Sequence, residues 1–213
     1  QATNDQFLLA ARPVGMPKDS DWQRATPALA PLVEGEVRVK ILYISLDPAM
    51  RGWMNDARSY VRPVAIGEVM RAGGVGVVTE SASPKFAVGD HVMGVTGVQR
   101  YWTGPADDKG AMLAKVDPAM APLPTWLNAL GMPGMTAYFG LTEVGQPKAG
   151  ETVVVSGAAG AVGMTVGQVA KQLGCRVVGI AGGEDKCRFV VEELGFDACI
   201  DYKAGPVQAG LKQ

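Results

Sequence analysis

The most constraining feature of this chain is a run near its C-terminal end, from residue 151 to 203. β-prone residues at 152–156 lead into a glycine-rich turn, and apolar residues at helical spacing follow until Gly174. A strand pattern at 175–180, a second helix beginning at Glu184 and a third strand complete the run. Strands that alternate with helices in this way predict a parallel sheet built from βαβ units.

The turn after the first strand, Ala158 to Gly163, carries a variant of the G-x-G-x-x-G pattern. Its second and third glycines are present, and Ala158 replaces the first. Gly160 would let the backbone approach a pyrophosphate, Gly163 would let helix and strand pack closely, and the helix N-terminus would present free N–H groups. An ordinary βα turn is the alternative, which the surrounding βαβ pattern disfavours. The run therefore predicts half of a dinucleotide-binding sheet.

The end of the second strand indicates which dinucleotide is preferred. About 20 residues after the turn, an NAD site offers a carboxylate to the ribose 2′-OH; this chain has Ala181, Gly182 and Gly183. Glu184 and Asp185 follow, but acids in a first helical turn are most simply partners of the helix dipole. The cations behind this glycine floor, Lys186 and Arg188, suit a 2′-phosphate and favour NADP(H). A solvated helix face is the alternative for both.

Composition excludes several classes of partner. With 20 basic and 21 acidic residues and 47% hydrophobic residues, the chain has globular composition and no basic run for nucleic acid. No apolar stretch approaches the roughly 18 residues of a membrane span, and no signal-peptide pattern opens the chain, so we expect a cytoplasmic protein. The three cysteines match neither a disulfide framework nor a zinc site and are expected as free thiols; they are Cys175, Cys187 and Cys199.

The first 122 or so residues have a different pattern from the rest. Short β-like runs alternate with glycine and proline and predict a barrel or sandwich; they are 6–11, 36–44, 74–79, 91–95, 98–102 and 111–116. The only histidine, His91, is expected at a loop or strand edge, since one imidazole builds no zinc site. The proline-rich connection at 122–124 sets the domain boundary near residue 123, and helical spacing begins at Trp126.

The C-terminal sheet is expected to be incomplete. A sheet of order 3-2-1-4-5-6 has its first strand at the centre, yet this sequence ends soon after the third strand. The strand at 152–156 would then be an edge strand with an apolar run suited to burial. We therefore expect the chain to be a fragment of a longer protein.

Several motifs of the chain together resemble the medium-chain dehydrogenase/reductase superfamily. Within it, the chain is similar to the zinc-independent branch of NADPH-dependent alkenal, prostaglandin and curcumin reductases. The motifs that carry the resemblance are S-L-D-P-A-M-R-G at 45–52, G-M-P-G-M-T-A-Y at 131–138, G-Q-P-K at 145–148, the turn at 158–163, G-C-R-V-V-G at 174–179 and L-G-F-D at 194–197.

The resemblance implies an α/β protein with a β-barrel. Residues 1–123 would form a GroES-like barrel that carries most of the substrate pocket, and 124–213 the N-terminal half of a Rossmann domain. Zinc-dependent relatives have a cysteine where this chain has Ser45, so no metal is implied. A homodimer is also implied.

The resemblance assigns residues to the site one by one. Met132 and Thr136 correspond to the nicotinamide side, and Gly182 lies where the adenosine ribose passes. The 2′-phosphate contacts are Lys186 and Tyr202, and the pyrophosphate-facing turn comprises Ala161, Val162 and Gly163, beside Gly160. Tyr60 matches a pocket tyrosine that could hydrogen-bond an incipient enolate oxygen, with a half-exposed loop aromatic as the alternative.

The implied reaction is NADPH-dependent reduction of the carbon–carbon double bond of an α,β-unsaturated ketone or aldehyde, a small-molecule substrate. Hydride would reach the β-carbon, and the enolate would then be protonated. Two alternatives stay open: an NADPH-dependent quinone reductase and a non-catalytic NADPH-binding protein.

Overall fold

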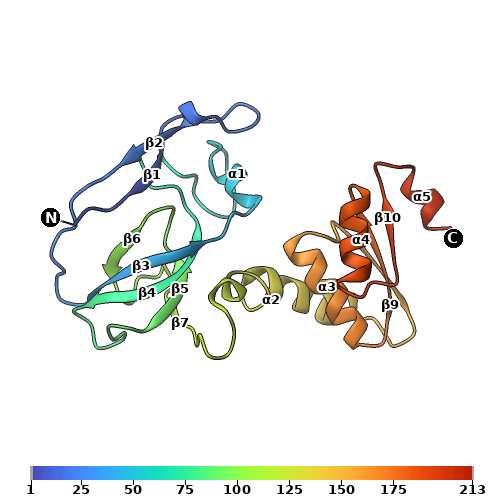
Figure 1. Ribbon diagram of the computed structural model, residues 1–213. Coiled ribbons are helices and arrows are strands. Elements are labelled where there is room, and N and C mark those ends of the chain that lie inside the picture. Colours follow the sequence, from blue (N-terminus) through green and yellow to red (C-terminus); the bar gives the residue numbers. More distant parts are fainter. Residues whose placement is uncertain (1, 213) are drawn as a thin grey trace. The chain divides into compact units, whose positions relative to one another are not determined.

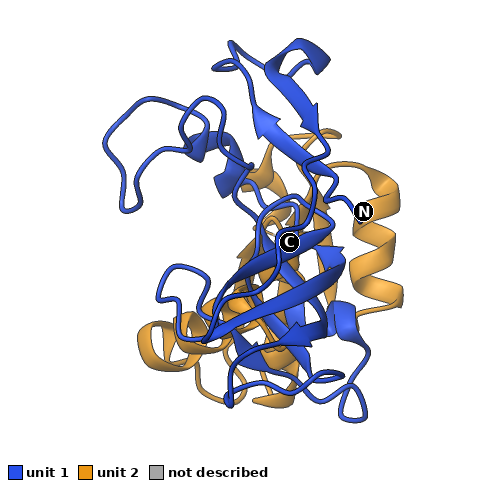
Figure 2. Cartoon of the chain, turned by 90° about the vertical axis from the view of Figure 1, so that its left-hand side faces the viewer, with its two compact units in different colours: residues 1–127 blue, residues 128–213 orange. Residues whose placement is uncertain are grey.

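The computed structural model describes residues 2–212, which form an α/β protein. The chain divides into two compact units between Leu127 and Asn128, shown in two colours in Figure 2. The first unit is built mainly of antiparallel strands, and the second of parallel strands and helices. The assignment of these units as a substrate domain and a nucleotide-binding domain stays a prediction.

The main sheet of the first unit has five antiparallel strands in the order β6-β3-β4-β5-β7 (Figure 1). The strands are β3 (Glu36–Ile44), β4 (Gly73–Ser81), β5 (His91–Val95), β6 (Tyr101–Pro105) and β7 (Ala114–Lys115). One apolar cluster lies on this sheet and includes Val37, Val39, Val78, Phe86 and Val92. Alternation along β3 explains this cluster in part, because β-branched side chains on one face of a strand pack well against neighbours.

A second, smaller part of the first unit surrounds the antiparallel pair β1 (Gln6–Leu9) and β2 (Trp22–Ala25). The 3₁₀ helices η1 (Asp19–Asp21) and η2 (Leu123–Leu127) and the short helix α1 (Ala49–Trp53) complete the unit. A separate core cluster joins β1 to α1 through Leu9, Met50, Met54, Val64 and Met70.

The sequence pattern predicted β3 and β5 with the bounds that the structure has. It missed β2, and it placed β6 too early, at 98–102. Gly97 has a positive φ of 76°, and the backbone after it bonds to β1 instead, where the Phe7 N–H donates to the Val98 carbonyl at 3.0 Å. The strand order of the five-stranded sheet is open, and closure into a barrel stays a prediction.

The second unit contains a three-stranded parallel sheet in the order β10-β9-β8. The strands are β8 (Thr152–Ser156), β9 (Arg176–Ala181) and β10 (Ala198–Asp201), joined by α3 (Ala161–Gln172) and α4 (Glu184–Glu192). Among the described residues β8 pairs only with β9, so it is an edge strand here. The order third-second-first is the one expected for half of a dinucleotide-binding sheet.

The remaining elements of the second unit are α2 (Met132–Phe139), the π-helix η3 (Gly140–Gly145) and α5 (Val207–Gly210). Helix α2 packs against α3, and both α3 and α4 pack on the sheet. The core of the unit is formed by Leu141, Val155, Ala170, Val177, Val190 and Phe196. Phe196 reaches α3 at Gly167, where an added Cβ would lie 2.8 Å from its Cε2 and nearer still to Cζ. The helix therefore approaches the sheet closely because this residue has no side chain.

Candidate functional site

The carboxyl ends of β8, β9 and β10 meet at one edge of the parallel sheet. In open α/β sheets, ligands bind at this edge. The segments that follow the three strands are the glycine-rich turn at 157–160, the Gly182-Gly183 pair and Tyr202. Most of the cofactor residues expected from the sequence therefore come from one edge of one sheet.

In the turn after β8, Gly157 has a left-handed backbone conformation, with a φ of 59°. Ala158 donates its N–H to the Ile180 carbonyl at 3.1 Å, and Gly160 donates to the Gly157 carbonyl at 2.8 Å. Ala158 is fully buried, and its methyl group is 2.9 Å from the position that a Cβ on Gly179 would occupy. Ala158 thus replaces the first glycine of the motif because the residue before it takes the conformation that needs glycine.

Gly163 allows α3 to start directly against this turn. A Cβ on Gly163 would lie 2.9 Å from the carbonyl carbon of Gly157 and 3.0 Å from the Cα of Ala158. Those neighbours are backbone atoms and cannot rotate away. The sequence analysis expected close packing at Gly163, but it did not single out Gly157. The spacing Gly157, Gly160, Gly163 directly after a strand is the signal that could have found it.

The first turn of α3 presents N–H groups that have no acceptor within the helix. The first intrahelical bond runs from the Met164 N–H to the Gly160 carbonyl at 2.9 Å. The N–H groups of Ala161, Val162 and Gly163 precede it and, as at any helix start, have no intrahelical partner. Together with the helix dipole they form a surface suited to an anion.

The loop after β9 is held by a carboxylate from the end of β10. Asp201 Oδ1 accepts the N–H of Gly183 at 2.8 Å and that of Lys203 at 2.9 Å. These backbone hydrogen bonds lower the pKa of Asp201 from its usual value. Gly183, with a φ of 110°, then caps α4. Sequence reasoning missed Asp201, because its partner Gly183 is a backbone group in the loop before α4, 18 residues earlier in the chain.

Lys186 is exposed in the first turn of α4, and it makes no ion pair within residues 2–212. The neighbouring cation differs, since the Arg188 guanidinium is paired with the Asp185 carboxylate. Of the three carboxylates close to the glycine pair, Asp201 at the end of β10 and Asp185 on the helix have partners, and the exposed Glu184 has no ion pair among the described residues. The charge of Lys186 is left available to an anion.

Tyr202 lies directly over Gly182. A Cβ on Gly182 would be 2.6 Å from the Tyr202 Cζ and 2.9 Å from its Cε1. The tyrosine is held at its backbone, where its N–H donates to the Ala181 carbonyl at 3.1 Å, and the side chain is half exposed. The structure thus brings together two residues that the sequence analysis assigned to the adenosine end of the cofactor.

Met132 and Thr136 lie on α2, one helical turn apart and therefore on the same face. Both are exposed. The helix begins close to the preceding loop, because a Cβ on Gly134 would lie 2.9 Å from the Cα of Ala129. The packing of α2 against α3 fixes these two residues in the same unit as the glycine-rich turn.

Tyr60 belongs to the first unit and lies on a loop after α1. Its side chain is 80% exposed, and its hydroxyl oxygen accepts a hydrogen bond from Trp53 Nε1 at 3.3 Å. The Trp53 ring in turn lies under the Arg71 guanidinium, 5.4 Å from the ring centroid. Because the indole occupies one lone pair, the hydroxyl proton of Tyr60 is directed elsewhere and can be donated.

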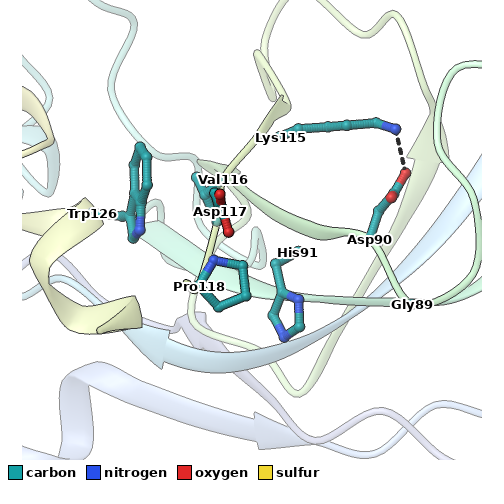
Figure 3. Close-up of a pocket in the computed structure, with 8 residues that line it drawn as sticks. All are labelled: Gly89, Asp90, His91, Lys115, Val116, Asp117, Pro118 and Trp126. Atoms are coloured by element: carbon teal, nitrogen blue, oxygen red, sulfur yellow. Dashed lines mark ion pairs between the residues drawn. The ribbon is translucent and has the colours of Figure 1, made fainter. Parts of the chain in front are cut away.

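A separate pocket of about 470 Å³ lies in the first unit and is drawn in Figure 3. Its lining includes His91, Trp126 and an ion pair between Lys115 and Asp90 at 2.7 Å. The hydrogen bond from Lys115 lowers the pKa of Asp90. None of the site residues expected from the sequence lines this pocket.

Two further features concern metal-binding clusters and membrane-spanning helices. Within residues 2–212, no three histidine, cysteine, aspartate or glutamate side chains gather as they would around a metal ion. No helix in that range is both long and apolar enough to cross a membrane.

Comparison with known proteins identifies relatives along almost the whole chain. A family model described as the N-terminal domain of oxidoreductase matches residues 5–115. The NADPH-dependent curcumin reductase of Escherichia coli (strain K12) is 48% identical over 202 residues, which are 94% of this chain and 57% of that protein. The 2-alkenal reductase (NADP(+)-dependent) of Nicotiana tabacum is 42% identical over 207 residues, 95% of this chain and 60% of that protein.

A solved structure shows the same fold. The crystal structure of CurA from Vibrio vulnificus in complex with NADPH superposes with a TM-score of 0.88 and is 45% identical, with 97% of this chain and 60% of that chain covered. This chain spans about three fifths of the length of these relatives. The family model matches more than half of the sequence, and relatives more than 40% identical cover almost all of it. The chain therefore belongs to the zinc-independent medium-chain dehydrogenase/reductase superfamily of NADPH-dependent oxidoreductases.

Proposed function

We propose that this chain binds NADPH at the carboxyl ends of β8, β9 and β10. We further propose that the whole protein reduces the carbon–carbon double bond of α,β-unsaturated ketones or aldehydes. The relatives named as curcumin and alkenal reductases support the reaction class. The geometry of this chain's own residues supports the cofactor.

The observation that carries the cofactor proposal is the state of the charges beyond the glycine pair. An NAD site needs a free carboxylate for the ribose 2′-OH. Here Asp201 accepts two backbone N–H groups and Asp185 is paired with Arg188, while Lys186 has no ion-pair partner among the described residues. Glu184 is also unpaired among the described residues, but its place in the first turn of α4 makes it a partner of the helix dipole. The unpaired Lys186 suits a 2′-phosphate better than a hydroxyl.

The residues at the edge of the sheet fit the rest of the cofactor as well. Gly163 lets α3 begin directly against the turn, and Gly160 adds no side chain beside it, so that the N–H groups of Ala161, Val162 and Gly163 can bind a pyrophosphate. Tyr202 over Gly182 offers an aromatic face and a hydroxyl beside the adenosine ribose. Met132 and Thr136 on α2 would hold the nicotinamide side. When bound, NADPH supplies the hydride.

Tyr60 would act on the substrate as a hydrogen-bond donor. Hydride addition at the β-carbon of an enone places negative charge on its carbonyl oxygen, and a positioned donor stabilises that charge in the transition state. The hydrogen bond from Trp53 orients the phenol and leaves its proton for an acceptor. Protonation of the α-carbon then completes the reduction.

The broader organisation is part of the same proposal. Residues 1–123 would form the GroES-like barrel and 124–213 half of a Rossmann domain. The whole protein would be a cytoplasmic homodimer that acts on a small-molecule substrate.

The cofactor proposal is tested by Lys186→Ala in the whole protein, with binding of NADPH and NADH measured by calorimetry. Loss of the charge-assisted contact should weaken NADPH binding about 10–100-fold and leave NADH binding nearly unchanged. Lys186→Arg should keep the preference for NADPH. Lys148→Ala removes the same charge before β8, at the opposite edge of the sheet, and should leave both affinities unchanged. Equal binding of both cofactors, unaltered by Lys186→Ala, would refute the proposal.

The reaction is tested by steady-state rates with enones, enals and quinones. A kcat/KM at least tenfold higher for quinones, about 1.4 kcal/mol in transition-state binding, would favour the quinone reductase alternative. Tight NADPH binding without turnover of any of these substrates would favour the non-catalytic alternative.

A further inference from the structure

Two of the three cysteines lie against one another, close to the residues assigned to the 2′-phosphate. Cys187 is in the first half of α4, directly after Lys186, and Cys199 is on β10. Their sulfur atoms are 2.6 Å apart, and the Cys199 S–H donates to Cys187. All three cysteines of the chain are free thiols, and Cys175 is apart from this pair, with its sulfur 3.5 Å from the Lys148 carbonyl.

The packing of α4 on the sheet fixes the contact between the two thiols. Helix α4 packs on both β9 and β10, and Cys199 contacts the apolar core of the second unit. In β10, Cys199 is in register with Gly179 of β9, so its position is set by the parallel ladder. Cys187 is held by the α-helical bond from its N–H to the Gly183 carbonyl, 3.1 Å. Both sulfurs are thus carried by regular elements, and neither thiol is fully buried.

We propose that Cys187 and Cys199 form a peroxide-reactive pair that closes into a reversible disulfide between α4 and β10. A disulfide bond is about 2.05 Å long. The two sulfurs are 2.6 Å apart in the structure, so bond formation shortens that distance by about 0.5 Å.

The chemistry assigns a separate role to each thiol. Burial and the neighbouring Cys187 raise the pKa of Cys199 to about 12, so Cys199 keeps its proton at neutral pH. Cys187, which accepts that S–H, is therefore the sulfur that attacks a hydroperoxide. The O–O bond breaks, an alcohol or water leaves, and Cys187 becomes a sulfenic acid, oxidised by two electrons.

Cys199 then resolves this intermediate. Its sulfur attacks the Cys187 sulfur, the S–O bond breaks, and the Cys199 proton leaves with the hydroxyl group as water. A small-molecule dithiol or monothiol restores both thiols by exchange. The disulfide would join the helix that carries Lys186 to the strand that precedes Tyr202.

The test is mass spectrometry of the whole protein after treatment with hydrogen peroxide. We expect the loss of two hydrogen atoms, a peptide that links Cys187 to Cys199, and full reversal by dithiothreitol. Cys199→Ser should instead accumulate a sulfenic acid at Cys187 that dimedone traps, and Cys187→Ser should give no dimedone adduct at Cys199. Cys175→Ala is the matched control and should form the disulfide as the parent does.

Oxidation of Met16, 82% exposed, reports in the same spectra that peroxide reached the protein. The proposal is overturned if Met16 oxidises while the Cys187–Cys199 peptide stays reduced, or if the disulfide found involves Cys175 or a second molecule. Far-UV circular dichroism of each variant shows whether it is folded. If a variant is not folded, the mass spectra of the parent protein alone decide whether the disulfide forms. The test uses no cofactor, so its failure is independent of the proposed NADPH site.

Discussion

The close approach of α3 to Phe196 leads to a stability prediction that can be worked through from the structure. In Gly167→Ala, the new methyl carbon would lie 2.8 Å from the Phe196 Cε2 and closer to Cζ and Cε1, whereas carbon atoms in contact prefer about 3.5–4.0 Å. The ring is 3% exposed. The ring lies between two glycines, because a Cβ on Gly179 of β9 would also be close to it, 3.1 Å from Cδ2.

The expected magnitude combines two opposing effects. Overpacking of a core costs about 1–3 kcal/mol, and alanine in place of glycine in a helix interior gains about 1 kcal/mol. Since the ring is buried and three of its atoms lie within 3 Å of the added methyl, we expect the upper part of that range and a net loss of about 1–2 kcal/mol. For a chain of this size, that loss corresponds to a fall in Tm of about 2–8 °C.

Thermal unfolding followed by far-UV circular dichroism measures this difference. Gly140→Ala is the matched control, since Gly140 has helical angles, φ −60° and ψ −38°, and no atom within 4 Å of its added Cβ. It should unfold at the parent temperature or slightly above. In a Phe196→Leu background the added methyl has more room, so the two substitutions should couple by about 1–3 kcal/mol. A Gly167→Ala protein as stable as Gly140→Ala, or additive with Phe196→Leu, would refute the reasoning.

Two further predictions concern the first unit. Tyr60→Phe should lower kcat for an enone by about 10²–10³-fold with little change in KM, because a donor to the developing oxyanion is lost. Trp53→Phe, which removes the orienting N–H and part of the ring under Arg71, should lower kcat less. An unchanged kcat for Tyr60→Phe would exclude the catalytic role. The hydrogen bonds from the Arg62 side chain and the Ala65 N–H lower the pKa of Glu68 to about 2. The contribution of ionised Glu68 to folding stability is therefore fully present above the usual carboxyl pKa of about 4.3 and is lost as the pH falls through about 2. Titration of the Glu68 carboxyl followed by NMR should find the low midpoint, and Arg62→Gln should raise that midpoint. A midpoint near 4 in the parent protein would contradict the pairing with Arg62.

The periodicity of apolar residues predicted the strands that have one apolar face. β3 and β8 carry β-branched runs that are ended by turn residues, and both have the expected extent. β2 was missed because the polar residues Gln23 and Arg24 interrupt its apolar pattern, although the strand pairs along its length with β1. Such a strand is defined by its partner and leaves little pattern in its own sequence.

The candidate site was predictable to the extent that it depends on local turns. Gly160 and Gly163 follow from a strand–turn–helix pattern, and Lys186 from its distance to that turn. The positions of Asp201 and Cys199 relative to the loop and helix before them arise only when β10 pairs with β9. The contact between Cys187 and Cys199 joins a helix to a strand, so the spacing of the cysteines in the sequence did not indicate it.

The turn at Gly157 also has a consequence for how this sequence can vary. The methyl group of Ala158 occupies the space that a side chain at Gly179 would need. The two positions can therefore hold one methyl group between them. In a relative with glycine at the first position, alanine fits at the second if the Phe196 ring, whose Cδ2 would be 3.1 Å from the new methyl, shifts slightly. Variation at the start of the motif should be correlated with variation in the neighbouring strand, so that the two sites evolve as a pair.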